Sequence, residues 1–211
     1  MRRLLAGLAL SAAAVGTALA AQAPAEAWEI GPVIKGRNYS VGMPATLQPG
    51  RDGPWFAFPT QGEGHVHYVT LQGGALPDRG TVVLRYRIDA ARGARFIAQD
   101  APDQTATISL FFQRTGDNWT ARGRYGDYRW YAPPATLMPV MPGEHTVRVR
   151  LDDPNWGNVN GQQARDQGDG FAQALANGGR AGFVFGSSSR RGHGVFATAP
   201  ARFTLLDFRI E

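Results

Sequence analysis

The sequence predicts an all-β protein built as a two-sheet antiparallel β-sandwich with at most one short helix. Apolar and polar residues alternate with a period of two in several short segments, which is the signal of half-buried strands. Clusters of Gly, Pro, Asn and Asp separate these segments at fairly even intervals, as in sandwiches and barrels. Helical segments that could connect parallel strands do not lie between them, so the strands are expected to pair antiparallel.

The clearest alternation lies in the segments 81–89, 105–114 and 144–152. In these segments large apolar residues recur at every second position, and strand geometry turns alternate side chains to opposite faces of a sheet. We therefore expect the alternating apolar residues to share one core. They are Val82, Leu84, Tyr86, Ile88, Ile108, Leu110, Phe112, Val147, Val149 and Leu151.

A hairpin and one short helix are expected alongside further strands. Residues 118–123 and 127–132 flank a Gly-containing turn, which predicts a hairpin. Asp169 can cap a short helical segment that ends before Gly178. The remaining strand-like segments are 28–34, 55–58, 65–71, 181–185 and 201–210.

Residues 1–23 have the order of a secretory signal peptide. Arg2 and Arg3 precede an apolar run, and small residues suited to cleavage follow it. The run is short for a permanent membrane span. We therefore expect cleavage between residues 20 and 27, an exported location in the periplasm or outside the cell, and a single β-sandwich domain over residues 28–211.

The composition disfavours several partners. The formal net charge of +5 includes Arg2 and Arg3 of the predicted signal. The basic residues form no block and no nucleic-acid motif occurs, so nucleic acid is not an expected partner. The chain contains no cysteine. Packing or a bound ion must therefore supply the stability that disulfides give many exported domains.

Arginines recur at i, i+2 spacing in three places, which in a strand places both side chains on one face. If the three strands shared a sheet, six guanidinium groups would line its solvent side and could bind carboxylate or sulfate groups through forked hydrogen bonds. The alternative is a solvated sheet face. The pairs are Arg85 with Arg87, Arg122 with Arg124, and Arg148 with Arg150.

Aromatic residues crowd the predicted hairpin. Alternation cannot bury the neighbours Trp130 and Tyr131 on the same side, so at least one is expected to face outward. Exposed rings suit stacking on sugar rings, whereas in the alternative interpretation they seal the edge of the core. Trp156 stands in a loop rich in Asn and Gln. The candidate ligand-binding residues are Tyr128, Trp130, Tyr131, Trp156, Arg85, Arg87, His65 and His67.

Metal binding is considered at three places. His65 and His67 share a strand face, as an H-x-H metal-binding pair does, and His145 or His193 could complete the ligands. The alternative is that they are ordinary residues of a half-exposed strand. No cofactor is expected other than a structural calcium ion, for which hard oxygen donors gather in one loop region, although without EF-hand spacing. These donors are Asp152, Asp153, Asn155, Asn158, Asp166 and Asp169. Glu29 and Asp207 are a second place for such an ion, and the alternative is that all these residues only form turns.

Two segments carry a resemblance to a known group of folds. Residues 201–211 (ARFTLLDFRIE) resemble the closing strand of bacterial secreted jelly-roll domains. Residues 180–186 (RAGFVFG) resemble the penultimate strand of concanavalin A-like lectin/glucanase domains. The resemblance implies a jelly roll of this type or of the carbohydrate-binding-module type, with a sugar-related ligand. It transfers no catalytic residue, because the E-x-D-x-x-E strand motif of jelly-roll glucanases does not occur.

The leading functional hypothesis is an exported, non-catalytic carbohydrate-binding β-sandwich, with an anionic glycan as the ligand that the arginines favour. The first alternative is a polysaccharide lyase or glycoside hydrolase of the same fold. A lyase needs an Arg to neutralise the uronate and a His or Tyr to take the proton. The second alternative is a structural envelope or adhesion protein. The lyase candidates are Arg85, Arg87, His65, His67 and Tyr128.

The signal-peptide assignment predicts where the mature chain begins. Because the small-residue cleavage positions follow the apolar run, the exported protein should start between Ala21 and Trp28. N-terminal sequencing of the protein from the exported fraction tests this directly. Recovery of Met1 or Arg2 on the soluble protein would contradict it.

Overall fold

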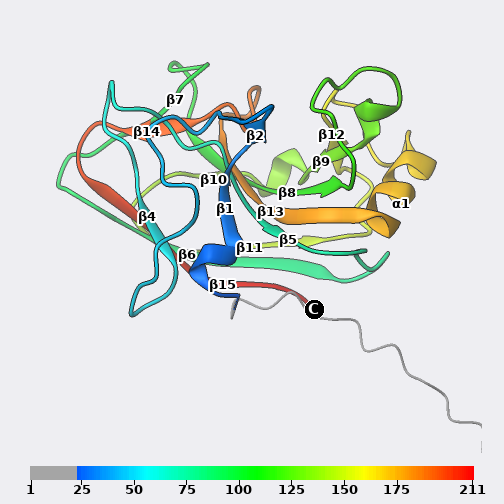
Figure 1. Cartoon of the computed structure of the whole chain (residues 1–211), viewed down its shortest axis with the longest axis horizontal. Helices are drawn as coiled ribbons and strands as arrows, with labels where there is room; N and C mark the ends of the chain where they lie inside the picture. Colours follow the sequence, from blue (N-terminus) through cyan, green and yellow to red (C-terminus); the bar gives the residue numbers. More distant parts are fainter. Residues whose placement is uncertain (1–22) are drawn as a thin grey trace, which may run out of the picture.

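Two antiparallel β-sheets pack face to face in the computed structural model, which describes residues 23–211 (Figure 1). Residues 1–22 of the predicted signal peptide lie outside the described residues. The larger sheet has seven strands in the order β1-β5-β13-β8-β9-β12, with β10 paired to β8. Its strands are β1 (Trp28–Gly31), β5 (Tyr68–Gln72), β8 (Thr107–Arg114), β9 (Arg129–Tyr131), β10 (Met138–Pro139), β12 (Gly157–Asn158) and β13 (Gly178–Gly186).

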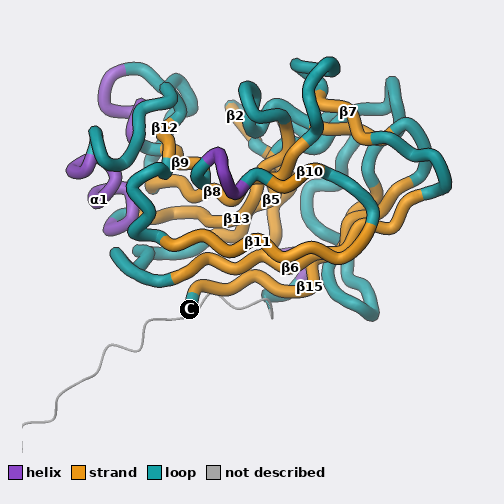
Figure 2. Tube along the Cα trace, turned by 180° about the vertical axis from the view of Figure 1, so that it is seen from behind, coloured by secondary structure: helices purple, strands orange, loops and turns teal. Residues whose placement is uncertain are grey.

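The second layer is a four-stranded sheet in the order β11-β6-β15-β4 (Figure 2). All pairings between named strands in the described part of the chain are antiparallel. The chain passes back and forth between the layers, as in a jelly roll. The strands of this sheet are β4 (Trp55–Ala57), β6 (Thr81–Ala90), β11 (Gly143–Arg150) and β15 (Ala201–Ile210). Two small sheets pair β2 (Val33–Ile34) with β3 (Arg37–Asn38), and β7 (Phe96–Ala98) with β14 (Val195–Ala197).

Helical structure is minor. The single α-helix among the described residues, α1 (Gly168–Ala176), lies where the sequence predicts a short helix. Three 3-10 turns accompany it: η1 (Ala25–Ala27), η2 (Gly123–Asp127) and η3 (Pro134–Thr136). The prediction of an all-β antiparallel sandwich with at most one short helix is confirmed. No helix within residues 23–211 combines the length and apolar character needed to cross a membrane.

The core between the sheets is strongly aromatic. The Phe203 ring of β15 stacks on Phe56 and Tyr86 of its own sheet, with centroids 5.1 and 5.2 Å away. It also stacks on Phe183 of the opposite sheet at 5.1 Å. The predicted set of ten alternating apolar residues is confirmed as part of this core, because each of them is buried in the same cluster: Val82, Leu84, Tyr86, Ile88, Ile108, Leu110, Phe112, Val147, Val149 and Leu151.

The predicted hairpin is wrong. Residues 118–123 form no strand, and β9 pairs with β8 and β12 instead. The backbone explains the difference, because Trp119 and Ala121 have φ values of 66° and 56°. Such left-handed conformations are uncommon for residues other than glycine and do not fit an extended strand. The segment therefore folds as a loop over the seven-stranded sheet.

The packing predicts the cost of truncating a core side chain. Leu84→Ala and Leu110→Ala should each lower the free energy of unfolding by about 2–5 kcal/mol, because each leaves a cavity in a closely packed core. Urea denaturation measures the loss. A neutral result for either variant would show that its strand does not face the core.

Candidate functional site

The outer face of the seven-stranded sheet, which points away from the core, carries a second and smaller set of packed side chains. Strand alternation separates them from the main core, since their chain neighbours face inward. A groove lies on this face between the strands and the covering loops, with a volume of about 310 Å³. We call it the sheet groove. The outer-face cluster consists of Tyr68, Phe111, Tyr131 and Val184, with Trp119 and Val159 against it.

Two tyrosine hydroxyls meet in the sheet groove. The Oη atoms of Tyr68 (β5) and Tyr131 (β9) are 2.8 Å apart and share a hydrogen bond. The pKa of Tyr68 lies well above its ordinary value, mainly because the hydroxyl is buried and secondly because Tyr131 is its neighbour. Burial also raises the pKa of Tyr131. Both phenols are therefore neutral at pH 7 and act as hydrogen-bonding groups rather than as bases.

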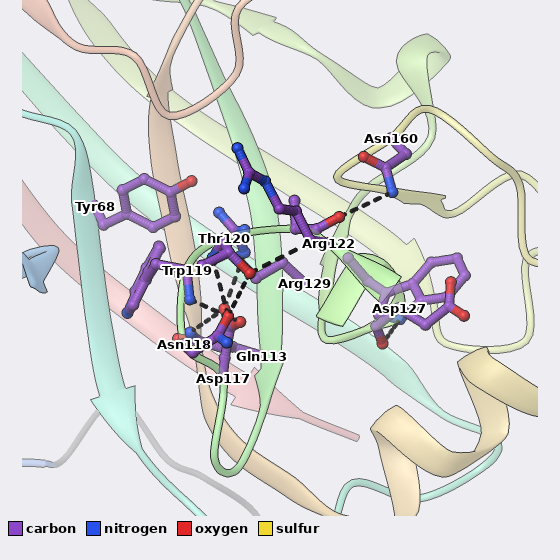
Figure 3. A network of polar contacts seen from close by, with 12 residues as sticks. Tyr68, Gln113, Asp117, Asn118, Trp119, Thr120, Arg122, Asp127, Arg129 and Asn160 are labelled. Carbon is purple, nitrogen blue, oxygen red and sulfur yellow. Dashed lines mark hydrogen bonds and ion pairs between the residues drawn. The ribbon is translucent and has the colours of Figure 1, made fainter. Parts of the chain in front are cut away.

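Arg129 of β9 is a buried guanidinium that lines the sheet groove. Its side chain is only 8% exposed, and its Nε lies 2.9 Å from Oδ2 of Asp117, which is 1% exposed. Gln113 Nε2 and the Trp119 backbone N–H donate to the same carboxylate, at 2.9 and 3.0 Å (Figure 3). The Nη2 of Arg129 has no hydrogen-bond partner within residues 23–211. A buried donor without a partner is costly.

The loop 187–194 forms one wall of the sheet groove. Arg191 donates from Nη1 to the Ala132 carbonyl at 2.5 Å, which ties the loop to the chain just after β9. Ser189 donates from Oγ to Gln104 Oε1 at 2.9 Å. Gly192 has φ 72°, and a Cβ there would lie 2.5 Å from the Tyr68 hydroxyl. Only glycine lets the loop approach this ring so closely.

The loop 155–163 forms the opposite wall and is organised by the buried side chain of Asn158. Its Nδ2 donates to Asp127 Oδ1 at 2.7 Å. Its Oδ1 accepts from the backbone N–H groups of Asn160 and Gln162 at 3.0 and 2.9 Å. The Oε1 of Gln163, which lines the sheet groove, is buried without a partner in the described part of the chain. The hydrogen bonds of Asn158 therefore hold this wall of the sheet groove in place.

The charge of the sheet groove is one-sided. Arg129, Arg190, Arg191 and His193 line it, and no Asp or Glu does among the described residues. Burial lowers the pKa of Arg191, but a guanidinium stays protonated in proteins. His193 Nδ1 lies 2.9 Å from Asp100 Oδ2, outside the lining. The groove is therefore suited to a group with negative charge.

Of the eight residues predicted to bind a ligand, only Tyr131 lines the sheet groove. Trp130 and Trp156 are 0% and 1% exposed, so neither ring can stack on a ligand. Trp130 packs edge-on against Phe171 at 4.9 Å and belongs to the core between the sheets. Alternation does place Trp130 and Tyr131 on opposite faces, but the tryptophan is the inward one. Tyr128 is buried too, with the Arg114 guanidinium 4.7 Å from its ring centre.

The predicted face of six arginines does not form. Arg122 precedes η2 and Arg124 lies within it, so neither belongs to a sheet. The other four line the outer face of the four-stranded sheet, where β6 and β11 are neighbours. Acidic partners accompany all four. They are Arg85 with Glu144, Arg87 with Asp52 and Asp89, Arg148 with Glu211, and Arg150 with Asp152.

The His65 and His67 rings lie 4.6 Å apart, just before β5. Burial lowers the pKa of His67 to about 4, so its ring is neutral at pH 7. Burial likewise lowers the pKa of His65. Neither ring lines the sheet groove. No three His, Cys, Asp or Glu side chains within the described residues gather as a metal site would require.

The candidate ligand-binding residues predicted from the sequence did not include Tyr68, Arg129, Arg191 or Trp119. Strand alternation contained a signal for two of them, because Arg129 shares its face with Tyr131, and Tyr68 lies opposite the core residue Val69. The ion pair between Arg129 and Asp117 and the hydrogen bond from Arg191 to the Ala132 carbonyl each join separate segments of the chain. They depend on loop conformations that local patterns do not predict.

Comparison with solved structures shows a distant likeness. No protein-family model and no curated protein matches the chain. Among solved structures the chain is similar to a xylan-binding module CBM15, with 13% sequence identity and a TM-score of 0.41, over 85% of this chain and 90% of that chain. At this distance the likeness carries no argument about a ligand, so the sheet groove is interpreted from its own residues.

The buried ion pair predicts an asymmetric response to mutation. Asp117→Ala should lower the free energy of unfolding by about 3–5 kcal/mol, because it leaves the Arg129 guanidinium buried without its counter-charge. The control is Asp89→Ala, which removes an exposed partner of Arg87 and should cost less than about 1 kcal/mol. Urea denaturation compares the two. Equal losses would contradict the buried pairing.

Proposed function

We propose that the protein is an exported, non-catalytic carbohydrate-binding β-sandwich that holds an acidic sugar residue of a glycan in the sheet groove. The observation that carries the proposal is the lining of arginines and a histidine without a carboxylate. Arginine suits this role, because its fork of N–H donors matches the geometry of a carboxylate. Export is supported by the signal pattern of residues 1–23.

The remaining groups of the sheet groove fit the rest of a sugar. Tyr68 and Tyr131 place hydroxyls at the floor, and the amides of Asn155 and Gln163 line one wall. Small-molecule sites commonly have volumes of roughly 300–1,000 Å³. The groove lies near the lower end of that range, which suits one or two sugar rings. Hydroxyl and amide groups can bond sugar hydroxyls in many geometries, whereas the arginines favour a sugar residue with a negative charge.

The proposal is non-catalytic, and the protonation and placement of the candidate bases favour it over the lyase alternative. The raised pKa values of Tyr68 and Tyr131 leave no phenolate to abstract a proton at pH 7. The residues that the sequence offered for a lyase lie outside the sheet groove: Arg85, Arg87, His65, His67 and Tyr128. Incubation with uronate polysaccharides should therefore release no unsaturated product that absorbs in the near ultraviolet. Product formation would establish the lyase alternative.

Binding is tested with two arginine variants of equal charge. Arg191→Ala should weaken binding of polygalacturonate or alginate by about ten- to hundredfold, because a hydrogen bond to a charged group contributes about 1.5–3 kcal/mol. Arg85→Ala removes the same charge from the four-stranded sheet, where Glu144 pairs with Arg85 at 3.5 Å, and should leave affinity unchanged. Isothermal titration calorimetry measures both.

Four further outcomes of this titration decide the proposal. Wild-type affinity should fall as salt rises, because charge attraction is screened over about 10 Å at 0.1 M salt. Neutral polysaccharides should bind more weakly than acidic ones. If Arg85→Ala weakened binding and Arg191→Ala did not, the site would lie on the four-stranded sheet. Lack of binding to all acidic polysaccharides would reject the proposal.

A further inference from the structure

A second hollow lies on the same outer face, with a volume of about 290 Å³. Glu29, Gln72, Gln113 and Arg180 line it from β1, β5, β8 and β13. Their chain neighbours Trp28, Leu71, Phe112 and Ala181 belong to the core between the sheets. Strand alternation therefore turns these polar side chains to the face that carries the sheet groove.

The second hollow is lined by charges of both signs. Arg180 Nη1 lies 2.7 Å from Glu29 Oε1, and Asp117 is engaged with Arg129. Arg114 donates to Gln173 Oε1 at 3.1 Å. The lining thus holds two arginines and two carboxylates, whereas no carboxylate lines the sheet groove among the described residues, and only Arg129 there has a buried carboxylate partner, Asp117. The second hollow suits uncharged hydroxyl and amide groups.

A row of polar side chains, of which Gln113 and Arg129 are buried, lies between the two hollows. Register partners across β5, β13, β8 and β9 are Gln72 with Arg180, Arg180 with Gln113, and Gln113 with Arg129. The first three residues line the second hollow, and Arg129 lines the sheet groove. The row runs across the strands without an apolar interruption.

Trp119 stands where the hollows meet. It lines the second hollow, and its ring lies edge-on to Tyr68 at 5.5 Å and 4.9 Å from the Arg129 guanidinium, both of which line the sheet groove (Figure 3). The side chain is half-buried. The left-handed backbone at Trp119, uncommon for a large residue, directs the loop so that the ring reaches the sheet face.

We propose that one linear glycan chain crosses the strands and fills both hollows, with an acidic sugar residue in the sheet groove and an uncharged one in the second hollow. Trp119 contacts the chain between them. The ligand class is therefore a polysaccharide in which acidic and uncharged residues are mixed, bound along its length. This inference rests on the proposed function, because the sheet groove must hold the acidic residue.

Chain length and charge pattern test the proposal by calorimetry. The probes are dimers and hexamers of alternating glucuronate and N-acetylglucosamine, and oligogalacturonates of the same lengths. The alternating hexamer should bind at least about tenfold tighter than its dimer, since it reaches both hollows. It should also bind at least about fivefold tighter than the all-acidic hexamer. Equal affinities in the second comparison would overturn the assignment of an uncharged residue.

Two variants locate the second contact. Trp119→Ala should weaken binding of the alternating hexamer by a larger factor than binding of the dimer, because the ring contacts the chain between the hollows as well as Tyr68 and Arg129 of the sheet groove. The matched control is Trp55→Ala, since Trp55 also lies under an arginine, Arg202 at 3.9 Å, but on the four-stranded sheet. Gln72→Ala should weaken hexamer binding alone, with the exposed Gln48→Ala as its control. Gln72 is exposed at the end of β5, so its truncation should not unfold the protein. This variant therefore tests the proposal even if Trp119→Ala does not fold.

The outcomes separate the two proposals. If hexamers bind no tighter than dimers, or neither Trp119→Ala nor Gln72→Ala affects them, while Arg191→Ala still weakens binding, the crossing chain is rejected and the sheet groove is retained. If no acidic oligosaccharide of either pattern binds, the proposed function itself is rejected.

Discussion

The packing of aromatic rings around Phe203 holds the two sheets together. Its ring contacts Phe56 and Tyr86 within the four-stranded sheet and Phe183 across the interface. Because the protein has no cysteine, no disulfide assists this contact, and buried apolar area must supply the stability. The inward positions of the central strands are therefore filled with large apolar side chains, and chemical function is left to the outward positions and the loops.

Because the large apolar side chains fill the inward positions, the seven-stranded sheet has an apolar inner face and a more polar outer face, and both are buried. Its inner face is filled by residues such as Phe183 and Phe185. Its outer face is covered by loops and has few apolar residues, so polar groups are buried there with them. Arg129 and Asp117 are among these groups. Burying such a pair is favourable only with good geometry and further hydrogen bonds, and Gln113 and the Trp119 N–H supply two of these.

Strand alternation made the core predictable from the sequence, because the inward positions of β6, β8 and β11 form one periodic apolar pattern. The same rule established that Trp130 and Tyr131 face opposite ways, but not which one faces inward. That choice depends on Phe171 of α1, which packs against Trp130 and lies far away in the sequence. The hairpin prediction failed at Trp119 and Ala121 because nothing in their composition indicates a left-handed backbone.

The two arginine-bearing faces show why the number of arginines alone does not locate a binding site. On the four-stranded sheet Arg85, Arg87, Arg148 and Arg150 are more numerous and more regular, yet each has an acidic partner. An anion arriving there would have to displace a carboxylate that is already in place. In the sheet groove Arg191 bonds only a backbone carbonyl among the described residues, so its charge is not neutralised by another side chain. A ligand carboxylate therefore gains more interaction free energy at Arg191, although the sequence pattern draws attention to the other sheet.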